Sequence, residues 1–275
     1  MTFLNDLFQY QFFTNAFLAA LLTSLACGII GTYIVTKRIV FISGGITHAS
    51  FGGIGIGYFA GISPIMGAAI FSVLSALGIE YFSRKGDIRE DSMIAILWSF
   101  GMAVGIIFIF ITPGYAPNLM SYLFGNILTV TFSDIILLLA INFCILLFFV
   151  LLFKPILYIA FDESYAKTRN LPVRTIKYLL MSLIALTIVF SIKVMGIILI
   201  ISLLTIPQTT ANIFLKSYKK IMVLSVLIGF VGSSAGIIIS YYINIPSGAS
   251  IIFCLVIIFM FFRLSKQLLS RRKPV

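Results

Sequence analysis

Charge is scarce in this chain of 275 residues. Only 10% of them are Asp, Glu, Lys or Arg, whereas 61% are hydrophobic. A water-soluble domain of this length has too little interior to bury so much apolar surface. The scarcity of charge therefore excludes a water-soluble protein and indicates a chain whose solvent is the lipid bilayer. Because the polar stretches between the apolar runs are short, we expect one transmembrane domain over residues 1–275.

Side chains arranged for catalysis or for binding a cofactor are also scarce. The three cysteines, Cys27, Cys144 and Cys254, lie in separate apolar runs, without metal-ligand spacing or a disulfide framework. The G-x-x-x-x-G-K-[ST] loop is absent from the sequence, so any ATP must be bound by another chain. No pair of carboxylates lies within an apolar run, which argues against an ion-coupled carrier and an aspartic intramembrane protease. We therefore expect a chain that is not an enzyme.

The apolar runs predict an all-α bundle of about nine transmembrane spans, with eight as the alternative count. The predicted spans lie near residues 12–36, 39–60, 62–83, 92–112, 129–153, 175–192, 194–214, 221–243 and 248–263. A tight turn at Ser191-Ile192-Lys193 separates the sixth span from the seventh.

Basic residues indicate the orientation of the spans. All of the 19 Lys and Arg residues except Lys193 fall in loops or span ends on one side. Cytoplasmic loops retain Lys and Arg, so this pattern predicts an outside N-terminus and a cytoplasmic C-terminus. It also explains the net charge of +11 without nucleic acid as a partner, since the charges are spread over several short loops.

The second predicted span has a face of small residues. Residues four apart lie on one side of a helix, and such a face lets two helices approach closely in lipid. Helix packing is favoured over pore lining as the role of this face. Its members are Gly45, Ala49, Gly53, Gly57 and Gly61.

The same span carries His48, the one histidine of the chain. A polar ring inside the membrane costs free energy unless it has a partner, which favours a functional role. Neutral imidazole is a common ligand of transition metals. The alternative is a structural histidine that joins helices through a hydrogen bond. The residues alone leave both interpretations open.

The polar loop 161–174 predicts a short amphipathic helix on the cytoplasmic side. Asp162 is suited to the N-cap position, and Lys167 and Arg169 follow toward the end of the helix. Pro172 is expected to end this helix, because the residue before a proline is driven out of the α region. A solvated surface turn is the alternative.

Three stretches of this sequence form a set. The first is Lys37-Arg38 with residues 42–53, the second is 161–166 with 171–173, and the third is 193–196 with 202–211. Together they resemble the permease family of bacterial zinc and manganese ABC importers. They occur in the family's order, and the likeness extends over about residues 12–265.

The resemblance implies a membrane-spanning subunit of an ATP-driven importer for a divalent transition metal, in the plasma (inner) membrane of a bacterium or archaeon. Zinc and manganese are the leading cargo ions, with iron third, and the chain itself binds no cofactor. The implied partners are cytoplasmic ATP-binding subunits, a second copy of the chain, and an extracellular metal-binding lipoprotein or periplasmic binding protein. The family's ATPase-coupling element corresponds to Asp162, Glu163, Tyr165, Ala166, Leu171 and Pro172.

The sequence departs from the family at the metal site. The family's histidine corresponds to His48, but Gly44 stands where the family has an aspartate four residues earlier. Ser43 and Thr47 are weaker, neutral oxygen candidates for the missing ligand. Asn126 likewise replaces a family aspartate in the outer loop 113–128, which either re-enters the membrane or docks the binding protein.

Two other functions fit parts of this pattern. The same architecture can import a different cargo, such as a metal complex, and the missing carboxylate at position 44 keeps that alternative open. A self-sufficient secondary carrier or channel is the second, although the scarcity of intramembrane carboxylates argues against it.

Overall fold

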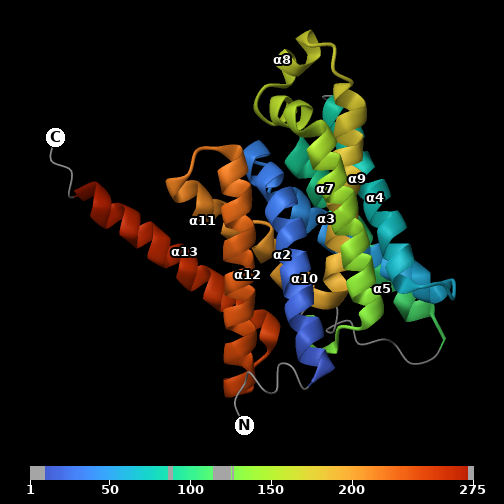
Figure 1. The fold of residues 1–275 in the computed structure, drawn as a ribbon. Coiled ribbons are helices and arrows are strands. Elements are labelled where there is room, and N and C mark those ends of the chain that lie inside the picture. The colour runs from blue at the N-terminus through green and yellow to red at the C-terminus, as the bar shows by residue number, and fades with distance from the viewer. Residues whose placement is uncertain (1–9, 86–88, 114–124, 126, 272–275) are drawn as a thin grey trace. The chain divides into compact units, whose positions relative to one another are not determined.

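The computed structural model describes residues 10–85, 89–113, 125 and 127–271, which are helical apart from the connections between helices (Figure 1). No strand occurs among these residues, which confirms the all-α fold. The elements are α2 (Gln11–Lys37), α3 (Phe41–Phe59), α4 (Pro64–Lys85), α5 (Glu90–Ile111), η1 (Ile127–Thr129), α7 (Phe132–Phe161), α8 (Glu163–Thr168), α9 (Val173–Met195), α10 (Ile197–Leu203), α11 (Ile206–Phe214), α12 (Tyr218–Ile243) and α13 (Ser247–Arg271).

Eight segments within the described residues are long and apolar enough to cross a membrane, in agreement with the lower predicted count. The helix α3 is not among them, because glycines, hydroxyl residues and His48 dilute its apolar side chains. The segment 197–214 qualifies as a whole, although it is divided into α10 and α11. Pro207 stands in the first turn of α11, where its missing N–H group leaves no helical hydrogen bond unmade.

Two predicted span boundaries are wrong. The helix α9 continues through the turn expected at Ser191-Ile192-Lys193 and ends at Met195, and Gly196, which has φ 77°, separates it from α10. A positive φ costs glycine no steric energy, which explains why the helix is interrupted there. The helix α7 extends to Phe161 instead of ending near 153. It passes Pro155 with a kink, marked by the non-helical angles of Leu152 (φ −114°, ψ 22°).

The chain forms two compact units, each built from separate stretches of sequence. The first unit comprises the described residues within 1–35, 123–142 and 194–275, and the second comprises those within 36–122 and 143–193. The second unit therefore contains α3, α4, α5, α8 and most of α9.

Buried amide side chains hold helices of the first unit together. Gln208 Nε2 donates to the carbonyl oxygens of Cys27 (2.7 Å) and Leu203 (3.0 Å). Asn142 Nδ2 donates to the carbonyl oxygen of Leu22 at 3.0 Å. Such interhelical hydrogen bonds matter in lipid, where burial of apolar surface does not drive helices together.

The second unit is organised around α3, which packs most extensively on α5 and α4. Ile54 of α3, Ala68 of α4 and Val189 of α9 form a buried apolar cluster. Other large apolar side chains are exposed, such as Phe110 (88%) and Val150 (75%). These side chains are suited to contact with lipid. This packing positions α3, which carries His48 and the face of small residues identified in the sequence.

Candidate functional site

The helix α3 meets its neighbours backbone to backbone. A methyl group added at Gly53 would overlap the backbone of Gly67 on α4, and one added at Gly67 would overlap the Gly53 carbonyl. On the other side, a methyl group added at Gly101 of α5 would overlap the backbone of Ala49. Because backbone cannot yield as a flexible side chain can, these crossings fix the position of α3.

The other small residues of the predicted face have different surroundings. An ideal Cβ at Gly57 would lie 3.0 Å from the Cα of Pro64, and one at Gly45 would overlap the side chain of Ile94. Gly61 does not belong to the face, because α3 ends at Phe59 and Gly61 lies in the following turn. With φ 67° and no atom within 4 Å of its ideal Cβ, Gly61 serves the turn and not helix packing.

His48 lies roughly two turns into α3 and is half-buried. Its ring stacks on the indole of Trp98 from α5, with ring centroids 4.1 Å apart and planes inclined by 6°. The Nδ1 atom of His48 is buried and makes no hydrogen bond within the described part of the chain. A buried ring nitrogen without a hydrogen bond is unusual, because it costs free energy of desolvation. It also leaves a lone pair or a proton available to a ligand.

Each of the two weaker ligand candidates donates a hydrogen bond to the backbone of its own helix turn. The Ser43 hydroxyl donates to the carbonyl oxygen of Val40 at 2.6 Å, and the Thr47 hydroxyl donates to the carbonyl oxygen of Ser43. Gly44 precedes His48 by four residues, so the position beside the imidazole on this helix carries no side chain. No group of three His, Cys, Asp or Glu side chains able to hold a metal occurs among the residues that were placed.

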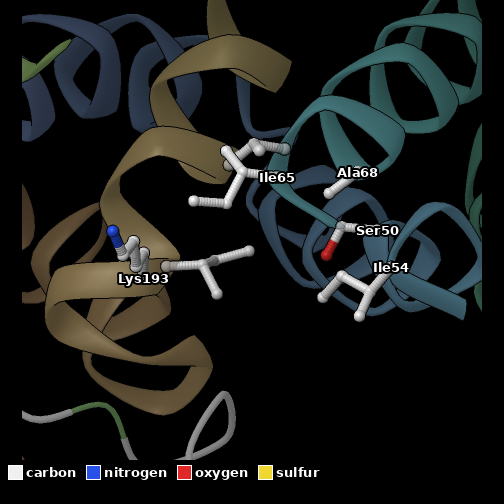
Figure 2. Close-up of a pocket in the computed structure, with 7 residues that line it drawn as sticks. Ser50, Ile54, Ile65, Ala68 and Lys193 are labelled. Atoms are coloured by element: carbon white, nitrogen blue, oxygen red, sulfur yellow. The ribbon is translucent and has the colours of Figure 1, made fainter. Parts of the chain in front are cut away.

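A small cavity lies between α3, α4 and α9 (Figure 2). Figure 2 shows Ser50, Ile54 and Ala68 on one side of it and Lys193 on the other. Its volume of about 10 Å³ leaves room for about one water molecule. The Ser50 hydroxyl on this cavity donates to the carbonyl oxygen of Thr47.

The polar segment 161–174 forms the short helix α8, with Asp162 at its N-cap. The Asp162 side chain accepts a hydrogen bond from the backbone N–H of Tyr165 at 3.0 Å. At the other end Asn170 is left-handed (φ 54°), and Leu171 N–H donates to the carbonyl oxygen of Ala166. Asn170 N–H also donates to the carbonyl oxygen of Lys167 at 3.0 Å. The bonds from Asn170 and Leu171 form a Schellman motif, which ends the helix before any proline is reached.

Pro172 therefore does not end α8, as the sequence suggested. It directly precedes α9, and its carbonyl oxygen accepts the first helical hydrogen bond from Ile176. Ala166, on the inner face of α8, is fully buried, whereas Tyr165 is exposed and contacts Tyr158 edge to face at 5.2 Å. The helix thus presents a polar and aromatic outer surface on a fixed base.

Glu163 belongs to an ion-pair cluster that the sequence did not reveal. It pairs with Lys167 at 3.1 Å and with Lys177 of α9 at 3.4 Å. Lys177 also pairs with Glu80 of α4 at 2.7 Å. Partial burial raises the pKa of the Glu163 carboxyl, but the hydrogen bond from Lys167 and the charge of Lys177 outweigh it and hold the pKa below its ordinary value.

Sequence reasoning missed Trp98, Lys177 and Glu80. Trp98 is the one tryptophan of the chain, and that rarity was its signal. The pair of Lys177 and Glu80 had no signal, because nothing in one sequence says that their helices are neighbours. Residues 114–124 and 126, which make up most of the loop 113–128 that we expect on the outer side, lie outside the described residues.

Comparison with known proteins identifies relatives along nearly the whole chain. The pattern of the ABC 3 transport family matches residues 9–266. An uncharacterized membrane protein of Synechocystis is 43% identical over 244 residues, which are 89% of this chain and 87% of that protein. The manganese transport system membrane protein MntC of Halalkalibacterium halodurans is 34% identical over 250 residues, covering 91% of this chain and 86% of its own length. The solved structure of PsaBC from Streptococcus pneumoniae in complex with Fab has a TM-score of 0.84 and 32% identity, and the match covers 94% of each chain.

Proposed function

Because this chain belongs to the ABC 3 transport family and is a membrane-spanning transport subunit, we propose that it imports a divalent transition metal ion, zinc or manganese, past His48. The name of the MntC relative, a manganese transport system membrane protein, supports a metal as the cargo. The observation that carries the proposal is the state of His48. Its ring stacks on Trp98, and its Nδ1 atom is buried without a hydrogen-bond partner among the described residues.

The ligand chemistry bears on which metal is carried. Imidazole suits zinc and iron, whereas carboxylate and carbonyl oxygens suit manganese. With Gly44 beside His48, one copy of the chain offers a nitrogen and no carboxylate at this point. A site of so few ligands binds weakly, which a translocation path requires if the ion is to leave again. A second copy of the chain, water or backbone oxygens would complete the coordination.

Transport would be driven by cytoplasmic ATP-binding subunits, which hydrolyse ATP on separate chains. We assign α8, with Asp162 at its N-cap and Tyr165 on its surface, as the element that these ATP-binding subunits contact. A second copy of the chain, an extracellular metal-binding protein and a location in the plasma membrane of a bacterium or archaeon complete the proposal. Membership of the family argues against the self-sufficient carrier.

Cells that lack this gene test both the cargo and the coupling helix. Their uptake of zinc, manganese and iron is measured after complementation with the wild type, Asp162→Ala, Glu163→Ala and the control Ser164→Ala. Ser164 is exposed on the same helix, so its replacement should leave uptake unchanged. The wild type should restore one of the three metals, and the Asp162 and Glu163 variants should lower uptake at equal membrane abundance. Restoration of none would mean a different cargo, such as a metal complex, and unchanged uptake in both variants would remove α8 from the coupling.

A further inference from the structure

One lysine joins three helices of the second unit. The Nζ atom of Lys177 on α9 lies 2.7 Å from Oε1 of Glu80 on α4 and 3.4 Å from Oε2 of Glu163 on α8. Glu163 also pairs with Lys167, but that pair lies within α8. Lys177 therefore ties α8 to the long helices beside it, whereas Lys167 does not.

Burial makes the link to Glu80 the stiff one. The side chains of Lys177 and Glu80 are 19% and 9% exposed, whereas that of Lys167 is 59% exposed. Solvent screens an exposed pair, so its partners separate at little cost. Separating a buried pair leaves an uncompensated charge in apolar surroundings, which is strongly unfavourable. A displacement of α9 near Lys177 must therefore carry Glu80 with it.

Glu80 stands on α4, one of the two helices that meet α3 backbone to backbone. At the crossing of α4 and α3, the backbones of Gly67 and Gly53 are in direct contact and leave no room for a methyl group. A movement of α4 is not absorbed by side chains at such a crossing. The contacts thus run from α8 through Lys177 and Glu80 to α4, and from α4 to the helix that carries His48.

We propose that Lys177 is a positioning residue that transmits displacement of α8 to α4 and so to α3. The inference rests on the proposed role of α8 as the element that the ATP-binding subunits grip. Lys177 acts here through its pairs with Glu80 and Glu163 and does not touch the cargo. Packed side chains, salt bridges and rigid helices of this kind carry energetic coupling between distant sites.

The test uses the complex of this chain with its ATP-binding subunits in proteoliposomes. Lys177→Met removes the charge at similar length and leaves Glu80 unpaired, so it lowers stability as well. The double variant Lys177→Met/Glu80→Gln removes both charges and leaves no unpaired carboxylate. Lys177→Arg keeps the charge, and Lys167→Met removes an exposed lysine that pairs only with its own helix.

Two readouts separate coupling from stability. The first is metal uptake per ATP hydrolysed. The second is the ATP-dependent signal of a fluorescent dye on Ile62→Cys, in the connection that follows α3, with Cys144 replaced because it is exposed. The dye reports movement at the end of α3 whatever the cargo is.

The double variant should keep the wild-type unfolding midpoint, lose about tenfold in uptake per ATP and lose the dye signal. Lys177→Arg and Lys167→Met should stay within about twofold of the wild type in both readouts.

A stable double variant that couples as the wild type does would overturn the link. A wild type without an ATP-dependent dye signal would overturn the role of α8 and the link with it. A wild type that moves none of the three metals, with a dye signal that still depends on Lys177, would refute the cargo and support the link.

Discussion

The imidazole of His48 and the indole of Trp98 lie face to face, with ring centroids 4.1 Å apart and planes inclined by 6°. His48 belongs to α3 and Trp98 to α5, and each is the one residue of its type in the chain. The stack covers one face of the imidazole and leaves the nitrogen-bearing edge as the part that can bind a cation. Trp98 therefore sets the plane in which His48 offers its nitrogens.

Replacement of Trp98 by Ala should weaken metal uptake, because the imidazole is then free to rotate away from its binding orientation. A stacked aromatic pair contributes about 0.5–1.5 kcal/mol, so the concentration for half-maximal uptake should rise about two- to tenfold. Trp98→Phe keeps an aromatic face and should remain near the wild type. Uptake measured over a range of metal concentrations checks this. An unchanged half-maximal concentration in Trp98→Ala would show that the stack does not position the ring.

Trp98 should also report metal binding directly. Its emission arises beside His48, so a cation on the imidazole should change the fluorescence of the purified chain. We expect Zn²⁺ or Mn²⁺ to produce a saturable change in emission that His48→Gln abolishes. Titration of both proteins with each metal makes the measurement. A saturable change of equal size in His48→Gln would place the metal elsewhere.

Two glycines of α4 should respond oppositely to the same substitution. Gly67→Ala forces a methyl group into the Gly53 backbone and should lower the free energy of unfolding by about 1–3 kcal/mol. Gly78→Ala is the matched control, since the nearest atom to its ideal Cβ is Leu97 Cδ1 at 3.9 Å. Alanine favours a helix over glycine by up to about 1 kcal/mol, so that variant should be neutral or more stable. Thermal unfolding in detergent compares the two, and equal destabilisation would contradict the close contact.

The stability that Glu163 contributes should depend on pH in one direction. Its folded pKa lies below the ordinary value, so its pairs stabilise the protein above the unfolded pKa and are lost as pH falls through the folded pKa. Glu163→Gln should therefore lower stability at neutral pH, by on the order of 1 kcal/mol or less because the side chain is 31% exposed. The difference between the two unfolding midpoints should shrink in acid below the ordinary glutamate pKa. A difference that grows in acid would contradict the assigned pairs.

The sequence predicts most of the helices, because apolar runs of sufficient length have few other solutions in lipid. It fails where a local signal competes with packing. Lys154 and Pro155 resemble the end of a span, yet α7 continues through them to Phe161 with a kink. Lys193 resembles a turn residue, yet α9 continues to Met195 and the interruption falls at Gly196, because glycine accepts the positive φ.

The site shows the same division between local and distant information. The cap by Asp162 follows from residue types a few positions apart, and it is present. The stack of His48 on Trp98 and the pair of Lys177 with Glu80 join residues far apart in the chain. A single sequence does not indicate which helices are neighbours, so these two contacts could be found only in the three-dimensional structure.

Uptake of radioactive zinc and manganese by the complete transporter in proteoliposomes, with wild-type chain, His48→Ala or the control Ser50→Ala, tests the central claim most directly. Ser50 lies on α3 near His48, and its hydroxyl donates to the backbone within the helix. If the ion passes His48, His48→Ala should lose most ATP-driven uptake while Ser50→Ala keeps it, at equal protein in the membrane. Wild-type uptake by His48→Ala would contradict the account and reduce His48 to a structural residue.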